Sequence, residues 1–316
     1  MKKTLIALAV MAASSASMAQ VTLYGVVDVA LGATSATGVK SDASMKGNDI
    51  FNDGNSRWGF KAVEDLGGGM KFTGQFEQNL NYENGAATTT SSRYAYGSLS
   101  GGFGTVKYGR TLTPSFFGVA AWELTGAANF SAVANQFGFA GGGSRNDSEF
   151  SYTTPKMGGL SASLGYVTEL DGIAQGFLGS KFDMNVVYSA GPLSAALSYW
   201  KNDKVAAGAS TDGNYALGAN YNFGAFSVAG SFQDAAGKSQ GWTLGASMPM
   251  GPWKFTVDVA QDTGFDDTNY VLYAGYSLSK RTTVYGQYHN DGKSGDAVKK
   301  TATTSETYGV GVRHNF

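Results

Sequence analysis

The last eleven residues of the chain, "ETYGVGVRHNF" (306–316), alternate between two kinds of side chain and end on an aromatic. Tyr308, Val310, Val312 and Phe316 share one parity, whereas the other parity holds glycines and polar residues. Such a period of two is typical of a β-strand whose two faces meet different surroundings. Chain ends usually fray, so a bare apolar terminus in this pattern indicates that the last residue is held in a sheet.

The first nineteen residues predict the compartment. Lys2 and Lys3 precede an apolar run at residues 5–11 and the small-x-small triplet at residues 17–19. This order predicts a secretory signal peptide over residues 1–19, whose cleavage leaves residues 20–316 as one domain. The alternative, a membrane anchor, is disfavoured because a spanning helix needs roughly 20 apolar residues.

The composition argues against several classes of protein. The chain has no cysteine, 45 glycines, five prolines and 13% aromatic residues, and its formal net charge is −1. Near-neutral charge argues against nucleic acid as a partner. Exported proteins meet an oxidising environment, and a chain without cysteine cannot form incorrect disulfides there. This proportion of glycine and aromatic residues is unusual for a soluble enzyme.

Period-two alternation recurs along the whole chain, in about a dozen stretches of roughly ten residues. In "MKFTGQFEQNL" (70–80), apolar Met70, Phe72, Phe76 and Leu80 alternate with polar residues. Further examples are "LSASLGYVTEL" (160–170), "WKFTVDVA" (253–260) and "TTVYGQYH" (282–289). A tilted transmembrane strand needs about 9–11 residues, so these stretches predict strands that cross a bilayer.

The connections between these stretches predict the architecture. Two kinds of connection alternate along the chain. One kind is short, as in "EDLGGG" (64–69), "SGGFG" (100–104) and "MPMGP" (248–252), and the other is long and polar, as in residues 35–56 and 289–306. Short turns on one rim and long loops on the other are typical of outer-membrane barrels. Seven short turns join seven strand pairs, and two terminal strands complete a sixteen-stranded antiparallel all-β barrel. A barrel of this size encloses an aqueous lumen. We expect residues 306–316 to close it by pairing with "VTLYGVVDVAL" (21–31), which leaves no unpaired edge in hydrocarbon.

One long connection differs from the others in composition. The stretch "TLTPSFFGVAAWELTGAANFSAVANQFGFAGGGSRND" (111–147) is rich in Phe, Ala and Gly instead of Asn, Asp and Lys. An exposed loop should be polar, so this loop is expected to pack against the inner wall and narrow the lumen. The alternative is a surface loop used for adhesion or subunit contact.

Three arginines start alternate strands of the expected barrel. Arg57, Arg93 and Arg145 precede the second, fourth and sixth strands, and neighbouring strands lie about 4.8 Å apart, so we expect guanidinium groups at roughly 10 Å spacing. Alternation also predicts the side that each residue faces. Trp58, Phe60, Tyr94 and Tyr96 are expected to face out, leaving Arg57, Lys61 and Arg93 in the lumen. A charge on the lipid face would cost about 2–4 kcal/mol at the midplane, which also favours the lumen. The alternative is that each arginine caps a loop carboxylate.

Parity separates two further basic residues on the fifth strand. Lys107 is expected to face the lumen, whereas Arg110 shares its side with Val106 and Tyr108 and is expected at a subunit interface. The acidic side of the constriction would come from Glu123 in the long loop and from Glu77.

No motif supports an enzyme or a resident cofactor. The two histidines, His289 and His314, have no cysteine or HExxH partner. The stretch "DTGFDDTN" (262–269) could hold a divalent cation on an outer loop, but a solvated loop tip is the simpler interpretation. We therefore expect no catalytic residue, no metal and no cofactor.

The motifs in their order resemble the trimeric Gram-negative general porins, and look closest to the beta-proteobacterial branch. The matching stretches are "VTLYGVVD" (21–28), "SRWGFKAVEDLGGGMKFTGQFE" (56–77), "SRYAYGSLSGGFGTVKYGRTLTP" (92–114), "LSKRTTVYGQYHN" (278–290) and "GVGVRHNF" (309–316). The resemblance implies a homotrimer in the outer membrane, passive diffusion of small hydrophilic solutes, and a third extracellular loop folded into the pore.

The resemblance also implies roles for particular residues and partners. Arg57, Arg93 and Arg145 correspond to the basic half of the constriction, and Arg110 corresponds to the trimer contact. The aromatic end, Phe316, resembles the signal read by the outer-membrane assembly machinery, although a plain girdle aromatic is compatible with the same pattern. Outer-membrane lipid and lipopolysaccharide would surround the barrel.

Two departures from the family pattern bear on selectivity. Val26 stands where many relatives carry lysine, and the long loop offers Glu123 and little other acid. A thin acidic wall leaves the arginines less compensated, which predicts a mild preference for anions. The rival hypotheses are a substrate-specific channel of the same fold and, from other classes, an outer-membrane adhesin or hydrolase.

Overall fold

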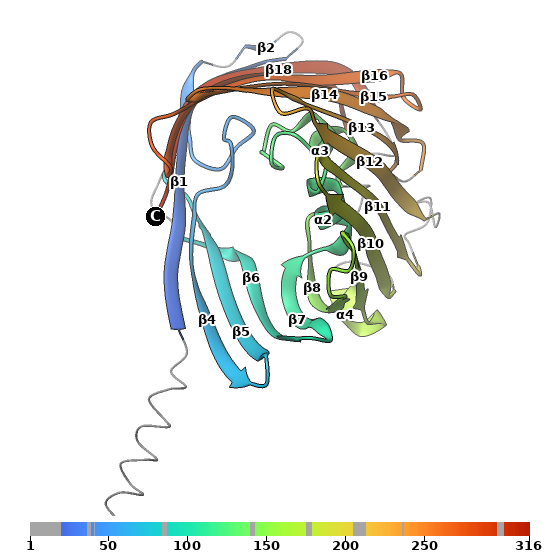
Figure 1. Cartoon of the computed structure of the whole chain (residues 1–316). Coiled ribbons are helices and arrows are strands. Elements are labelled where there is room, and N and C mark those ends of the chain that lie inside the picture. The colour runs from blue at the N-terminus through green and yellow to red at the C-terminus, as the bar shows by residue number, and fades with distance from the viewer. Residues whose placement is uncertain are drawn as a thin grey trace, which may run out of the picture.

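The computed structural model describes residues 20–36, 39–40, 42–83, 87–139, 143–174, 179–204, 213–235, 237–295 and 300–316. The expected signal peptide, residues 1–19, lies outside the described residues. The described strands form one closed antiparallel sheet, a sixteen-stranded barrel made of β1 and β4 to β18 (Figure 1). The fold predicted from alternation and turn lengths is confirmed.

The strands of the barrel wall have the following bounds: β1 Gln20–Ala36, β4 Arg57–Gly67, β5 Met70–Leu80, β6 Ala87–Gly101, β7 Gly104–Leu112, β8 Arg145–Thr153, β9 Leu160–Val167, β10 Lys181–Ala190, β11 Leu193–Asn202, β12 Asn214–Asn222, β13 Ser227–Asp234, β14 Gln240–Met250, β15 Trp253–Asp262, β16 Asp267–Ser277, β17 Thr282–Gly295 and β18 Lys300–Asn315. Two short strands, β2 (Val39–Lys40) and β3 (Ser44–Lys46), pair with β1 within the first long connection. The helices among the described residues are α2 (Pro114–Ala120), α3 (Ala132–Phe137) and α4 (Glu169–Ala174).

The barrel closes where its first and last strands meet. β18 pairs with β1 from Val26 opposite Asn315 to Ala36 opposite Ser305. Phe316 continues the pairing, because its N–H donates to the Gly25 carbonyl at 3.0 Å and its carbonyl accepts from the Gly25 N–H at 3.1 Å. A side chain on Gly25 would collide with the Phe316 ring, since an added Cβ would lie 2.2 Å from Cζ. The C-terminal aromatic is therefore part of the wall, as the alternation predicted.

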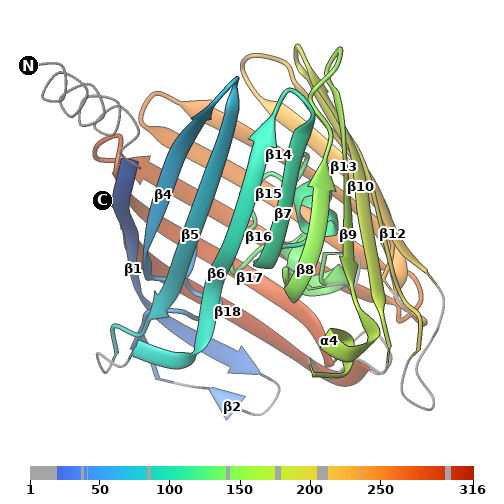
Figure 2. The ribbon, with the colours of Figure 1, turned by 90° about the horizontal axis from the view of Figure 1, so that it is seen from below.

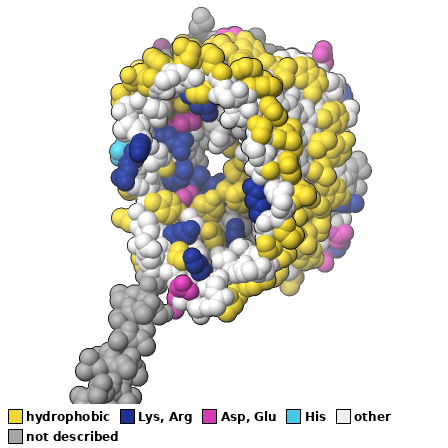
Figure 3. All heavy atoms as spheres, in the orientation of Figure 1, with side chains coloured by type: hydrophobic (Ala, Val, Ile, Leu, Met, Phe, Trp, Pro, Cys, Tyr) yellow, Lys and Arg dark blue, Asp and Glu magenta, His cyan; other side chains and the backbone are white. Residues whose placement is uncertain are grey.

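The outer face of the wall is apolar and the inner face is polar. Large apolar side chains such as Leu217 (56% exposed) and Val310 (60% exposed) point away from the lumen. In the space-filling view, hydrophobic side chains cover the outer rim, whereas Lys and Arg gather on the inner wall beside an open passage (Figure 3). This division is the one that lipid outside and water inside require. Among the described residues, no helix has the length and apolar character needed to cross a membrane.

The long connection between β7 and β8 folds into the barrel. We call residues 113–139, with 143–144, the inward loop. Its helices α2 and α3 lie within the ring of strands in both views of the ribbon (Figures 1 and 2). The side chain of Thr113 caps the first turn of α2 by accepting from the Phe116 N–H, and Ser131 caps α3 in the same way.

Apolar packing holds the inward loop against the wall. Val119, Trp122 and Val133 pack on Trp200 and neighbouring alanines of β11 and β12. Trp122 lies directly on Gly218, where an added Cβ would come within 2.3 Å of the indole ring. A second cluster joins Phe130 and Phe137 with Ala235, Ala260 and Val271. The unusual composition of this loop is thus explained by burial, at about 1.5–3 kcal/mol for each large apolar side chain.

Candidate functional site

The side of β6 that faces the lumen changes at a β-bulge. Glu77 of β5 pairs with Tyr94, but the next residue of β5, Gln78, pairs with Ser92, so Arg93 is the extra residue. A bulge shifts the alternation of the side chains on either side of it. The expectation that Tyr94 and Tyr96 face lipid is therefore wrong. The Tyr96 hydroxyl donates to Oε1 of lumen-facing Gln75 at 2.6 Å.

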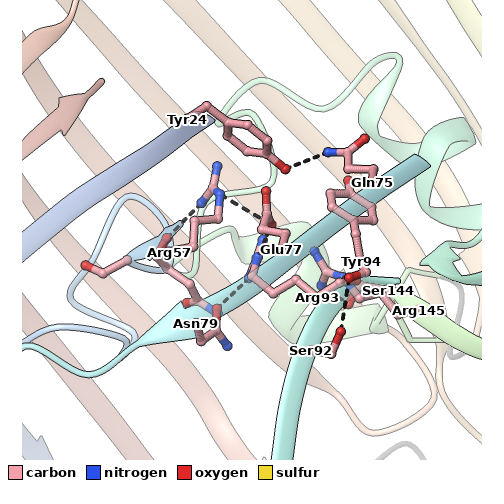
Figure 4. A network of polar contacts seen from close by, with 12 residues as sticks. Tyr24, Arg57, Gln75, Glu77, Asn79, Ser92, Arg93, Tyr94, Ser144 and Arg145 are labelled. Carbon is pink, nitrogen blue, oxygen red and sulfur yellow. Dashed lines mark hydrogen bonds and ion pairs between the residues drawn. The ribbon is translucent and has the colours of Figure 1, made fainter. Parts of the chain in front are cut away.

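Arg93 and Arg57 share one carboxylate on the strand between them (Figure 4). Nε of Arg93 donates to Oε1 of Glu77 at 2.6 Å, and Nε of Arg57 lies 3.5 Å from the same oxygen. Glu77 is only 3% exposed. The sequence placed Glu77 on an acidic side of the constriction, whereas the structure places it within the row of arginines. One buried carboxylate thus compensates part of the charge of two guanidinium groups.

Arg145 is the first residue of β8, where the chain leaves the inward loop. Its Nε donates to the Arg93 carbonyl at 3.0 Å, and its guanidinium carbon lies 5.6 Å from the centre of the Tyr94 ring. An arginine over an aromatic face gains a cation–π attraction. The three arginines are therefore linked through the Glu77 carboxylate and through the backbone carbonyl of Arg93.

The arginines border a cavity of about 440 Å³ between the wall and the inward loop. Its charged lining consists of four guanidinium groups and two carboxylates, from Arg57, Arg93, Arg145, Arg313, Asp53 and Glu77. The inward loop contributes Phe116, Phe139 and residues 126–129. Because α2 packs on β10 to β12 and α3 on β15 to β17, the loop narrows the lumen from the side opposite the arginines.

The two expected lysines lie on the inner wall but outside this cavity lining. Lys107 faces the lumen, where its Nζ lies 4.9 Å from the centre of the Tyr96 ring and donates to Thr111 at 3.2 Å. Lys61 pairs with Gln75 and Thr22 in the register, on the inner face and closer to the short-turn rim than Arg57. Lys61 is exposed to the lumen.

Glu123 stabilises the inward loop through hydrogen bonds to residues of the same loop. It is 7% exposed, and its carboxylate accepts from the Ala127 N–H at 2.8 Å, from the Ser131 hydroxyl at 2.8 Å and from the Thr125 hydroxyl. These bonds close the turn between α2 and α3. The carboxylate is directed at the loop's own donors, and Glu123 is not part of the lining of the 440 Å³ cavity.

Arg110 lies on the outside of the barrel, as its parity predicted. Its guanidinium donates to the carbonyl of Ser92 and to the carboxylate of Asp147. Tyr108 on the same face of β7 is 57% exposed. Arg110 therefore does not line the lumen.

Three charged residues of the constriction were missed by the sequence reasoning. Arg313 projects inward from β18 and forms an ion pair with Asp53 at 3.0 Å. Lys254 of β15 donates to the Leu124 carbonyl of the inward loop at 3.0 Å. The alternation of the last strand could have identified Arg313, because it shares the polar parity. Asp53 could not have been found in this way, because it lies in a long connection.

Two other candidates from the sequence, Asp262 and His289, form hydrogen bonds with neighbouring residues of the barrel. Asp262, at the start of the stretch "DTGFDDTN", accepts from the N–H groups of Gly264 and Phe265 and from the Ser239 hydroxyl at 2.6 Å. The described residues contain no group of three or more His, Cys, Asp or Glu side chains placed to hold a metal ion. His289 is buried, and its Nε2 lies 2.7 Å from Oδ1 of Asn269.

A closed barrel with an apolar exterior, a polar lumen and an inward loop defines a membrane channel with a constriction. The family model for the Gram-negative porins matches residues 4–296, so the chain belongs to this family. It is 36% identical over 315 residues to outer membrane porin protein 32 of Delftia acidovorans, covering 90% of this chain and 88% of that protein.

Solved structures agree with this assignment. The anion-selective porin from Comamonas acidovorans superimposes with a TM-score of 0.76 at 28% identity, covering 94% of this chain and all of that one. The trimer form of OmpT from Vibrio cholerae shares the fold at a TM-score of 0.62 and 14% identity. The protein is an outer-membrane porin that forms a water-filled channel for passive diffusion, and its family consists of channels.

Proposed function

We propose that this porin prefers anions mildly and that Arg57, Arg93 and Arg145 form the basic side of its constriction. The observation that carries the proposal is the cavity lining, in which the described residues supply four guanidinium groups and only two carboxylates. An uncompensated positive wall attracts anions and repels cations in a narrow aqueous passage. Lys61 and Lys107 add positive charge along the same inner wall. Glu77 lowers the net positive charge of these three arginines. Glu123 affects the constriction indirectly, because its hydrogen bonds hold the inward loop in position. The solved relative from Comamonas acidovorans, described as anion-selective, supports the proposal.

The reversal potential of the refolded protein in a tenfold potassium chloride gradient tests this proposal. We expect the sign that indicates faster passage of chloride than of potassium, with a current that rises linearly with solute concentration. A potential of zero or of opposite sign would contradict the anion preference. Saturable block by a solute would favour a substrate-specific channel, for which Tyr94, Phe116 and Phe139 in the cavity lining are the supporting observation. An adhesin would leave the bilayer electrically silent.

We also propose that the chain works as a homotrimer, surrounded by outer-membrane lipid and lipopolysaccharide. The placement of Arg110 on the outer wall, beside exposed Tyr108, supports its role at the contact between subunits. The porin OmpT, which shares the fold, occurs in a trimer form. A native mass equal to a single chain would contradict this proposal.

A further proposal concerns the assembly machinery, which we propose reads Phe316. The ring is 46% exposed on the outer side, while the backbone is held by Gly25. We expect F316A to refold in detergent almost as well as the parent, because both backbone bonds remain. Its level in the outer membrane of cells should fall several-fold. Equal losses in both measurements would indicate that Phe316 acts only as a wall residue, and V310A serves as the control on the same face.

A further inference from the structure

The first long connection enters the lumen, as well as the third. Residues 47–56 are held against the inner wall by Asp28 of β1. Its carboxylate accepts from the Tyr285 hydroxyl at 2.6 Å, from the Gly54 N–H at 2.9 Å and from Asn52 Nδ2 at 3.0 Å. Asp28 and Asn52 are fully buried, and Phe51 packs on Tyr285. We call residues 47–56 the L1 segment.

The L1 segment is joined to the inward loop across the lumen. Nδ2 of Asn129 donates to the Asp49 carbonyl at 3.0 Å and to Oδ1 of Asn55 at 2.7 Å. On its other side, the Asn55 carbonyl accepts from Nη1 of Arg57 at 2.7 Å. The two loops and the basic wall therefore share one network of hydrogen bonds. The L1 segment is built into the constriction and is not a surface excursion.

This arrangement places one acid of the L1 segment beside a lumen arginine. Oδ2 of Asp53 lies 3.0 Å from Nη1 of Arg313, and the Asp53 N–H donates to the Tyr285 hydroxyl at 3.2 Å. Asp53 and Arg313 border the 440 Å³ cavity and also a second cavity of about 330 Å³ that includes Lys254. Gly126 of the inward loop also lines both cavities, so the pair borders the same two spaces as this loop.

The neighbouring glycine lies between two guanidinium groups. An added Cβ on Gly54 would lie 3.6 Å from Nη1 of Arg313 and 3.8 Å from Nη1 of Arg57, which are ordinary contact distances. A Cβ at this position therefore fits without a collision, and a carboxylate carried on it would stand among the lumen arginines.

We propose that the L1 segment is a second constriction element, and that Asp53 sets the ion selectivity of the channel by compensating Arg313. Removing the Asp53 charge leaves Arg313 uncompensated beside both cavities. Adding an acid at Gly54 compensates Arg313 and Arg57 further. The L1 segment thus sets the net positive charge that a passing ion meets at the basic wall. The proposal rests on the proposed function for its starting selectivity, but its effects are measured relative to the parent protein.

Reversal potentials of D53N and G54D in a tenfold potassium chloride gradient test the proposal. We expect the chloride-to-potassium permeability ratio to rise roughly threefold in D53N and to fall roughly threefold in G54D, since each variant changes one unit charge close to the ion path. D65N is the matched control, because Asp65 is an exposed acid at the short turn between β4 and β5. It should change the ratio little.

Two further outcomes separate this role from a structural one. D53E retains the charge and should keep the parent ratio, whereas a merely structural role predicts that D53E and D53N behave alike. A D53N ratio equal to that of D65N, or a G54D ratio equal to that of the parent, would overturn the proposal. Cation preference of the parent protein would contradict the proposed function alone, because the opposite shifts of D53N and G54D would still be expected.

Discussion

Neutralising Arg93 and Arg145 together, as R93Q/R145Q, shifts the reversal potential in a tenfold salt gradient towards cations. The double variant leaves Arg57 and Arg313 against Glu77 and Asp53 in the cavity lining, so its formal charges balance. Loss of two unit charges near the ion path should lower the chloride-to-potassium permeability ratio by roughly tenfold. The shift should shrink at high salt, because screening at 1 M acts over about 3 Å.

A matched control exists one strand away. Arg110 is the same residue type as Arg93, but its guanidinium lies outside the lumen and bonds to Asp147 and the Ser92 carbonyl. R110Q should therefore keep the parent reversal potential. An unchanged potential in R93Q/R145Q, with the barrel folded, would remove these two arginines from the selectivity of the channel.

Replacing Asp183 by alanine releases the inward loop and raises the single-channel conductance. Asp183 of β10 is 1% exposed and accepts from the N–H and the hydroxyl of Ser115 at 2.7 and 2.9 Å, at the start of α2. Its carboxylate also interacts electrostatically with Lys181, which is equally buried and interacts with Glu149 as well. Leaving a buried donor such as the Ser115 N–H without its acceptor costs about 1–3 kcal/mol. A helix of seven residues such as α2 is too short to be stable away from the wall.

A graded series makes this prediction specific. S115A removes the hydroxyl bond to Asp183 and the contact of the same hydroxyl with Thr113 at 3.1 Å, but keeps the backbone N–H bond to Asp183. Its conductance should therefore rise less than that of D183A, and its current should be less noisy. The β-sheet signal in circular dichroism and the heat-dependent gel mobility would show whether the barrel remains intact. A folded D183A barrel with the parent conductance would mean that the remaining contacts hold the loop, namely the apolar packing around Trp122 and bonds such as that from Asn185 to the Pro114 carbonyl.

Most of the wall could be predicted from local pattern. Alternation in stretches such as residues 70–80 and 306–316 identified strands, and the two kinds of connection gave their number and direction. Lipid and water impose this pattern on every strand, so each stretch carries the information independently of the others. Composition predicted the inward position of residues 111–147 for a similar reason, because its Phe and Ala side chains need a surface to cover.

The candidate site was predictable only in part. Arg57, Arg93, Arg145 and Lys107 reach the lumen, but the orientation of Tyr94 was wrong because a bulge at Arg93 interrupts the alternation. A bulge adds one residue to one strand and leaves no clear mark in the spacing of apolar residues.

The sequence by itself determined most of the wall: which stretches are strands, which side of regularly alternating strands such as β5 and β18 meets lipid, and where the chain closes on Phe316. These properties depend on neighbouring residues and on the two solvents that every strand meets. Only the tertiary structure decided the constriction, because its contacts join distant parts of the chain: Glu77 between two arginines, Asp53 against Arg313, and Asn129 between two loops. The positions of these residues follow from how the loops pack inside the closed barrel. That packing cannot be predicted from the alternation of apolar and polar residues within any single strand.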